Sequence, residues 1–280
     1  MIYIILAVAA SAAVTLVMKA AGNGKGNRYG ILLGNYLTCV FLALIQRRPA
    51  GLRPDSVTVL CGIIGGILFV AGLVMMQKSI PANGASLTAA FSKLGLLVPL
   101  LLSVAVFHER LTLTRTAGIL LAMAAILVIH SAPSELSSGK ISTPLLAGVL
   151  LGCGSGDAMA KVFEEIGEPA QESLYFLILF AAASLITYGL SVPETKRTGL
   201  RIRKEDLLAG VAVGIPNYYS AAMLLKALDR LPAILVYPVC SAGSLVLIIL
   251  LSGLLFRERL RSRTLKGILM ILAALVLLNL

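Results

Sequence analysis

The feature that most constrains this chain is a succession of apolar stretches, each about long enough to cross a bilayer. A spanning helix needs about 20 predominantly apolar residues. Composition agrees, because 58% of the residues are hydrophobic and 13% are charged, against about 25% charged in a typical soluble domain. The sequence therefore predicts an all-α integral membrane protein with ten transmembrane helices, at residues 2–18, 29–45, 57–76, 82–107, 116–132, 142–163, 173–192, 207–225, 231–256 and 265–280.

The placement of charges and cysteines excludes several classes of function. A net charge of +11 would suggest nucleic acid in a soluble chain, but here the Lys and Arg residues lie in short loops. There they orient helices against the membrane potential and anionic lipid, so we expect membrane lipid and no nucleic acid as partner. The four cysteines are isolated, without the spacing of a metal or redox site. We therefore expect no metal and no cofactor.

A duplicated stretch indicates how the helices are organised. Residues 107–125 and 256–274 share Phe, then Glu-Arg-Leu, then Gly-Ile-Leu, then Ala-Ala at the same spacing. A recurrence of this kind indicates a duplicated unit. Each unit holds five helices, an odd number, so the two must insert in opposite orientations. The sequence predicts two inverted five-helix repeats, at residues 1–132 and 141–280.

Matched glycine pairs extend the repeat. Gly62 and Gly66 in the third predicted helix correspond to Gly210 and Gly214 in the eighth, and both pairs have GxxxG spacing. In membranes this spacing lets two helix backbones approach closely. We expect close helix packing at both places, and no ligand site.

The residues carry a resemblance to a known family. Two five-helix units, each ending in a Glu-x-Leu turn followed by Gly and an apolar run (Glu109 with Gly118, Glu258 with Gly267), are similar to the EamA-like permeases of the drug/metabolite transporter superfamily. The resemblance covers essentially the whole chain. It implies inverted repeats, a central cavity lined by the first four helices of each unit, and peripheral fifth and tenth helices. It says little about the substrate.

The loop charges and the family resemblance predict opposite orientations in the membrane. Corresponding loops of both units carry basic residues, at 47–53 and at 196–204, yet inverted units place these loops on opposite sides. Counting Lys and Arg by loop favours an N-terminus outside the cytoplasm. The resemblance implies an inside N-terminus, and we expect that orientation.

Polar groups within apolar helices are the candidate site residues, because each costs free energy and by default marks function. Lys93 lies well inside the fourth predicted helix, too deep for its ammonium to reach the interface. We expect it to bind substrate. The alternative is a structural ion pair with Asp157.

Asp157 and Lys161 lie four residues apart in the sixth predicted helix, with the acid first, which is the favourable order for an intrahelical pair. One interpretation is that they neutralise each other. The other is that Asp157, with Lys161, is a proton-coupling or amine-binding site. Lys161 and its repeat equivalent Lys19 are also candidate interfacial anchors.

The remaining candidates are polar, aromatic and proline residues in other helices. Pro216 cannot donate a backbone hydrogen bond, so a kink there would place the following amide and phenols as a ligand shelf. Substrate-binding candidates besides Lys93 are Asn35, Asn217, Tyr218, Tyr219, Tyr237 and Ser241, and hinge candidates are Pro99, Pro216 and Pro238.

These features predict a transporter of a small metabolite, an amino acid or related anionic or zwitterionic solute, by efflux or exchange with alternating access. The expected location is a bacterial-type plasma membrane, and assembly as a homodimer stays open. A flippase or structural subunit that handles an anionic lipid headgroup is the alternative, since a buried Lys suits it too. An enzyme is not expected, because His108-Glu109 lacks the second His of HExxH at Thr112.

Overall fold

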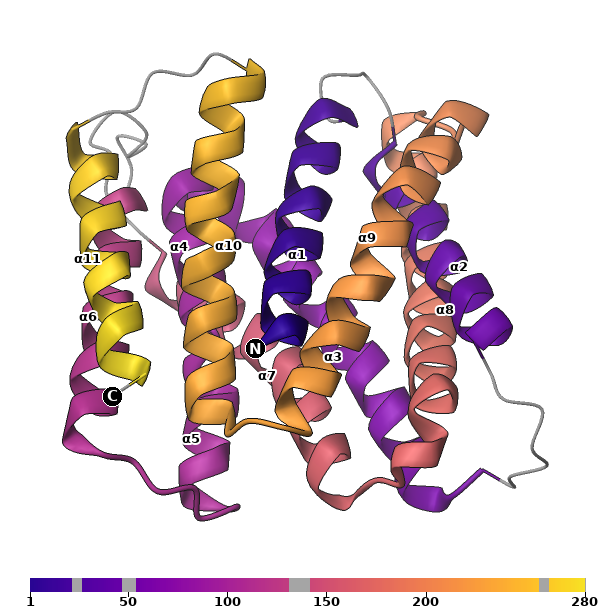
Figure 1. The fold of residues 1–280 in the computed structure, drawn as a ribbon. Coiled ribbons are helices and arrows are strands. Elements are labelled where there is room, and N and C mark those ends of the chain that lie inside the picture. The colour runs from indigo at the N-terminus through magenta and orange to yellow at the C-terminus, as the bar shows by residue number, and fades with distance from the viewer. Residues whose placement is uncertain (22–26, 47–53, 131–141, 257–261, 280) are drawn as a thin grey trace.

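The computed structural model describes residues 1–21, 27–46, 54–130, 142–256 and 262–279, and the described chain is almost entirely helical. The helices run up and down in a single bundle (Figure 1). The first half comprises α1 (Ile2–Ala21), α2 (Arg28–Gln46), α3 (Ser56–Asn83), α4 (Ala85–Leu94), α5 (Leu97–Ala105) and α6 (Leu113–His130). The second comprises α7 (Thr143–Ile166), a short η2 (Pro169–Gln171), α8 (Glu172–Thr198), α9 (Lys204–Leu228), α10 (Ala233–Phe256) and α11 (Ser262–Asn279).

Among the described residues, eight helical segments are long and apolar enough to cross a membrane. One of them, residues 87–105, comprises α4 and α5 together, while α6 and α11 contain shorter apolar runs. The chain is therefore an integral, multi-pass membrane protein. The inverted five-helix repeats stay a prediction.

The predicted fourth helix is two helices in the structure, which corrects the sequence-based boundaries. Helix α3 continues to Asn83 and ends at Gly84, whose φ of 81° suits glycine. Helices α4 and α5 are then separated at Gly95 and Leu96. Pro99 explains this break, because it has no N–H to donate to the carbonyl four residues earlier. The Gly95 carbonyl instead accepts from Val98 N at 2.9 Å.

The predicted close approaches are confirmed. A Cβ added to Gly66 would lie 2.6 Å from the Leu179 carbonyl of α8, and one added to Gly214 would lie 2.6 Å from the Asn35 carbonyl of α2. Glycine also brings α3 close to α7, since a Cβ on Gly72 would lie 2.9 Å from the Cys153 nitrogen. In lipid, such packing holds helices together.

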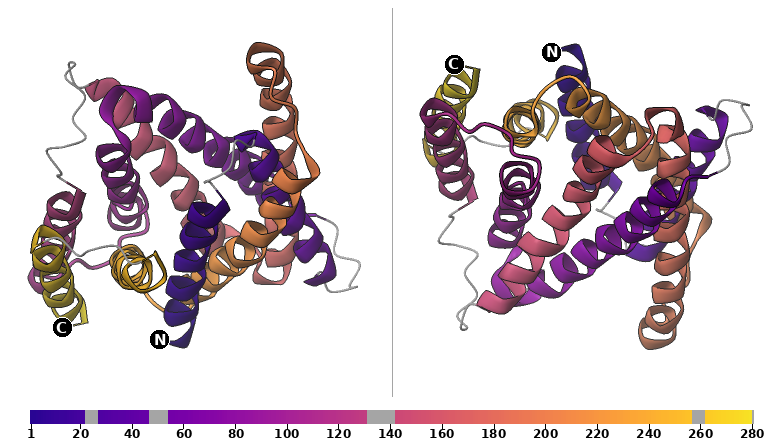
Figure 2. Two further views of the ribbon diagram at one scale, coloured as in Figure 1. Left: turned by 90° about the horizontal axis from the view of Figure 1, so that it is seen from above. Right: turned by 90° about the horizontal axis from the view of Figure 1, so that it is seen from below.

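The helices that the resemblance made peripheral lie at one edge of the bundle. Helices α6 and α11 pack side by side there, and both views of Figure 2 show them apart from α8 and α9. On the other side, α3 packs on α7 and α8, and α2 packs on α8 and α9. Helices α4, α7 and α10 lie between these groups and carry the candidate site.

The two ends of the bundle differ in charge. The acidic end, lower in Figure 1, carries Glu109, Glu164, Glu165, Glu168, Glu172 and Asp229 near the α5–α6, α7–α8 and α9–α10 links. The same links also carry Arg110, Arg115, Lys226 and Arg230, so the excess of negative charge among the described residues there is small. The basic end, upper in Figure 1, carries Lys19, Arg28, Lys78, Lys196, Arg197, Arg201, Arg203, Lys204 and Lys266. These cations outnumber the described acidic residues of that end, which are Glu194, Glu205 and Asp206.

Candidate functional site

Two opposite charges from the two halves of the chain lie in the interior. Lys93 is in the last turn of α4, directly before the break at Gly95, and Asp157 is in α7. The two side chains interact electrostatically, yet neither makes an ion pair or a hydrogen bond with any residue that the structure describes. Both keep some accessible surface. They therefore form a separated pair of opposite charges in the interior that are not in direct contact with each other.

Neighbouring side chains join α4, α7 and α10 around this pair. The Tyr237 hydroxyl donates to the Asp157 backbone carbonyl at 2.8 Å, which ties α10 to α7. The Ser92 hydroxyl donates to Cys153 Sγ at 3.4 Å, which ties α4 to α7 one turn away. The thiols of Cys153 on α7 and Cys240 on α10 lie near Lys93. We call Lys93, Asp157, Cys153, Tyr237 and Cys240 the central cluster.

The close approach of α4 to α7 has a local cause. Gly154 of α7 lies against the backbone at Gly95, and a Cβ on Gly154 would collide with the Gly95 carbonyl. A Cβ on Gly95 would in turn lie 2.9 Å from the Gly154 nitrogen. The helix break and the glycine contact therefore occur together, next to Lys93.

The residues of the predicted ligand shelf on α9 do not lie together around one ligand site but contact other side chains of the protein. Asn217 Nδ2 donates to Asn35 Oδ1 at 3.1 Å, so the two amides pair where α2 crosses α9. Tyr218 is buried among aromatic rings, 5.8 Å from Phe176 centroid to centroid, and its hydroxyl lies 3.4 Å from Gln46 Oε1. These contacts account for the side chains without a ligand, and none of them involves Lys93. Their role in binding stays a prediction, as do those of Tyr219 and Ser241.

Only one of the three hinge candidates lies at a helix break. Helix α9 continues through Pro216, and α10 continues through Pro238. Pro99 lies in the first turn of α5, directly after the break at Gly95 and Leu96. The structure therefore associates Pro99 with an interruption beside the central cluster.

Lys161 has partners other than the one predicted. Its Nζ lies 3.0 Å from Glu109, 2.7 Å from Glu164 and 2.5 Å from Glu165, so the expected pair with Asp157 does not form. Three nearby carboxylates attract the ammonium more strongly than one, and Asp157 has Lys93 beside it. The expectation of an interfacial anchor is also wrong, because Lys161 is only 2% exposed.

Glu109 gives this ion-pair network a second function that sequence analysis missed. Its carboxylate accepts from the backbone nitrogens of Ala233 at 3.0 Å and Ile234 at 3.1 Å, in the first turn of α10. A helix N-terminus has unpaired N–H groups and a partial positive charge, so a carboxylate there is stabilising. The recurring Glu-Arg-Leu turn was the available signal, although its second copy, with Glu258, lies outside the described residues.

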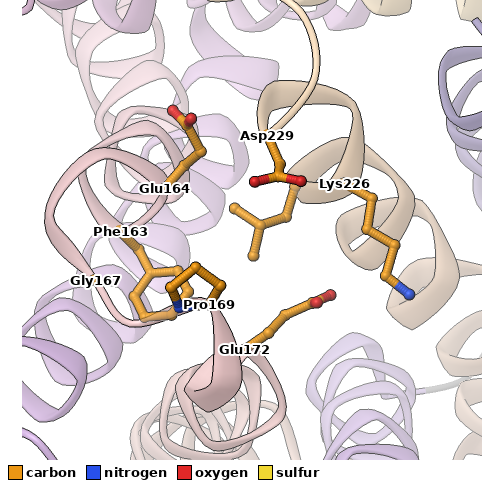
Figure 3. A pocket seen from close by; sticks show the side chains of 8 residues that line it. Phe163, Glu164, Gly167, Pro169, Glu172, Lys226 and Asp229 are labelled. Carbon is orange, nitrogen blue, oxygen red and sulfur yellow. The ribbon is translucent and has the colours of Figure 1, made fainter.

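A small cavity adjoins this network at the acidic end. It has a volume of about 90 Å³ and is lined by Phe163, Glu164, Gly167, Pro169, Glu172, Leu225, Lys226 and Asp229. Figure 3 shows Lys226 near the end of α9 and Asp229 directly after that helix, with Glu172 of α8 across the cavity from them. Ligand pockets are commonly about 300 to 1,000 Å³. The cavity is therefore too small to be the substrate site.

Comparisons with known proteins agree with this architecture. Residues 1–131 match the EamA-like transporter family. The match confirms the predicted resemblance to that family. The EamA-like match and the apolar helices indicate a membrane transporter of small solutes in the drug/metabolite transporter superfamily.

Two similar proteins extend the likeness beyond the EamA-like segment. A protein of Haemophilus influenzae, described as uncharacterized, is 22% identical over 284 residues, covering 97% of this chain and 95% of its own. A crystal structure of another protein matches with a TM-score of 0.72 at 16% identity, covering 99% of this chain and 98% of that one. At this identity the structural match shows the fold alone.

Proposed function

We propose that the protein transports a small anionic or zwitterionic metabolite, an amino acid or a related acid, across a bacterial-type plasma membrane by alternating access, with efflux or exchange as the direction. The observation that carries the proposal is the separated pair of Lys93 and Asp157. A charged side chain within the bilayer costs about 2.5 to 3.5 kcal/mol on insertion scales. Keeping both charges in the interior without an ion pair is explained if a ligand meets them.

The geometry of the pair suits a zwitterion. The Lys93 ammonium carries three donors and holds a carboxylate without demanding bidentate geometry. Asp157, on the opposite helix, offers an acceptor to an ammonium group of the same solute. A solute between them replaces the missing ion pair, so both charges are compensated in the bound state.

The helix break supports a role in conformational change. Lys93 lies at the end of α4, and the break at Gly95 separates it from α5. Hinges are commonly a few residues at the ends of elements. Movement of α4 relative to α5 would carry Lys93 with it, which links binding to a change of access.

Lys93→Met tests the proposal, because it keeps the length of the side chain and removes the charge. In proteoliposomes, the purified variant should take up a labelled amino acid more than about tenfold more slowly than the unmodified protein. This corresponds to the roughly 1.5 to 3 kcal/mol typical of hydrogen bonds to charged groups. Lys266→Met is the matched control, because it makes the same substitution at an exposed residue of α11. It should transport normally. Normal transport by the Lys93 variant, with its elution profile unchanged, would refute the proposal.

Asp157→Asn tests coupling. If Asp157 exchanges a proton, this variant should lose accumulation driven by a pH gradient and retain counterflow exchange, which needs binding but no net proton movement. If Asp157 only balances the charge of Lys93, the double variant with Lys93→Met should recover the folding or expression that the single variant loses. Recovery in the double variant would reject the coupling function.

A further inference from the structure

A large groove lies at the basic end, away from the central cluster. Its volume is about 680 Å³, and its walls come from the start of α2, the end of α3 and the end of α8. The charged residues that line it are Arg28, Lys78, Arg197 and Glu194. None of the central-cluster residues is among its lining, so the groove is separate from the proposed transport site.

We propose that this groove binds the headgroup of an anionic phospholipid, with the phosphate held by Arg28, Lys78 and Arg197. Three cations face one carboxylate, so the groove carries excess positive charge. Glu194 accepts from one Arg197 nitrogen at 3.1 Å, while the Arg197 side chain is 78% exposed. Arg28 and Lys78 are exposed and make no ion pair with any described carboxylate.

The order of residues along the walls fits a lipid better than a soluble phosphate. On α3, Val74 lines the groove one helical turn before Lys78, and on α8, Leu190 lines it one turn before Glu194. Both helices end at the basic end (Figure 1). Each wall therefore changes from apolar to charged toward the end of the bundle. This is the order in which a phospholipid presents its acyl chains and its headgroup.

Contacts between distant links hold one side of the groove together. Asn27 Nδ2 donates to the Leu200 carbonyl at 2.7 Å, which joins the start of α2 to the residues after α8. The Asn27 nitrogen also donates to the buried Asp206 carboxylate at 3.3 Å. Asn27 and Leu200 both line the groove, so hydrogen bonds fix the segments that carry its charged residues relative to one another.

The surrounding charge favours the same partner. The basic end also carries Arg201 and Lys204, both exposed, whereas the opposite end carries the acidic cluster. Anionic lipid attracts basic segments beside transmembrane helices, and basic pockets between such helices bind anionic headgroups. The proposal does not depend on transport, because the groove and the central cluster share no residue.

Lipid binding to the purified chain in detergent tests the proposal. Native mass spectrometry should show that short-chain phosphatidylglycerol binds more than about tenfold tighter than phosphatidylcholine with the same acyl chains. The double variant Arg28→Gln/Lys78→Gln should lose this preference. The control Arg110→Gln/Lys226→Gln removes one Arg and one Lys at the other end and should keep it. An unchanged elution volume in size-exclusion chromatography shows that a variant is still folded, so that a lost preference is lost binding. Lys78→Gln alone is a milder variant for the same comparison.

Three outcomes would overturn the proposal. The first is equal binding of the two lipids by the unmodified chain. The second is an unchanged preference in the Arg28 and Lys78 variants. The third is glycerol phosphate, the headgroup chemistry without acyl chains, competing as well as the lipid does, since this would assign the groove to a soluble phosphate.

Discussion

Replacing Lys161 by Met should destabilise the bundle strongly, although the residue lies outside the proposed transport site. The ammonium contacts Glu109, Glu164 and Glu165 at 3.0, 2.7 and 2.5 Å. Its side chain is 3% exposed. Removing it leaves three carboxylates close together in a poorly hydrated place.

The magnitude follows from the exposure of each partner. Removing one member of a buried ion pair typically costs about 3 to 5 kcal/mol. The Glu165 side chain is 33% exposed and can turn to solvent. Glu109 is only 12% exposed, but it keeps the backbone nitrogens of α10 as donors. We therefore expect the lower end of the range, about 3 kcal/mol.

The free energy of unfolding can be measured by titrating SDS into mixed micelles and following far-ultraviolet circular dichroism, since the chain has no Trp. Glu165→Gln is the control, because it removes the most exposed partner and leaves Lys161 two carboxylates. It should cost no more than about 1 kcal/mol, as exposed ion pairs do. The reasoning is refuted if the two variants lose the same stability, or if Lys161→Met loses less than about 1 kcal/mol.

Three further predictions follow from other parts of the bundle. Gly72→Leu should prevent folding in the membrane, because a Cβ there would lie 2.9 Å from the α7 backbone. Gly189→Ala should be neutral, because a Cβ at Gly189 would have nothing within 4 Å. The yield of detergent-extracted protein and its elution profile should fall for the first variant and stay unchanged for the second. Pro99→Ala restores a donor for the Gly95 carbonyl, so we expect a stiffer helix and slower transport with unchanged binding, and equal turnover would contradict this. The basic end should face the cytoplasm, against the orientation that the family resemblance implies. Alkaline phosphatase fused after Arg230, at the acidic end, should then be active, and green fluorescent protein fused after Gly199, at the basic end, should fluoresce. The reverse pattern would reject this orientation.

The parts of the fold that depend on local pattern were predictable. Apolar runs of spanning length located the helices, and GxxxG spacing at Gly62 and Gly210 located close contacts, because both signals arise within a single helix. The depth of Lys93 in its apolar run placed it in the interior for the same reason. Pro99 was identified as a hinge candidate, but its position alone did not show that the helix would separate into two at Gly95.

The pairing of charges was only partly predictable. Glu164 and Glu165 lie three and four residues after Lys161, so helical spacing alone allows these two ion pairs, whereas the other contacts depend on which distant segments meet. Asp157 is four residues from Lys161, so sequence spacing favoured that pair. The structure instead brings Glu109, from the turn after α5, to Lys161. Similarly, Asn35 and Asn217 were separate ligand candidates, and only the crossing of α2 and α9 shows that they bind each other.

The cap that Glu109 places on α10 makes the two halves of the chain mutually dependent. A polypeptide that stopped in the link after α6 would have this carboxylate but neither the amides of α10 nor Lys161. Such a fragment would bury an uncompensated charge unless the missing half arrived as a separate chain. A gene cut at that link should therefore yield two fragments that are each degraded when made alone and that rescue each other when made together.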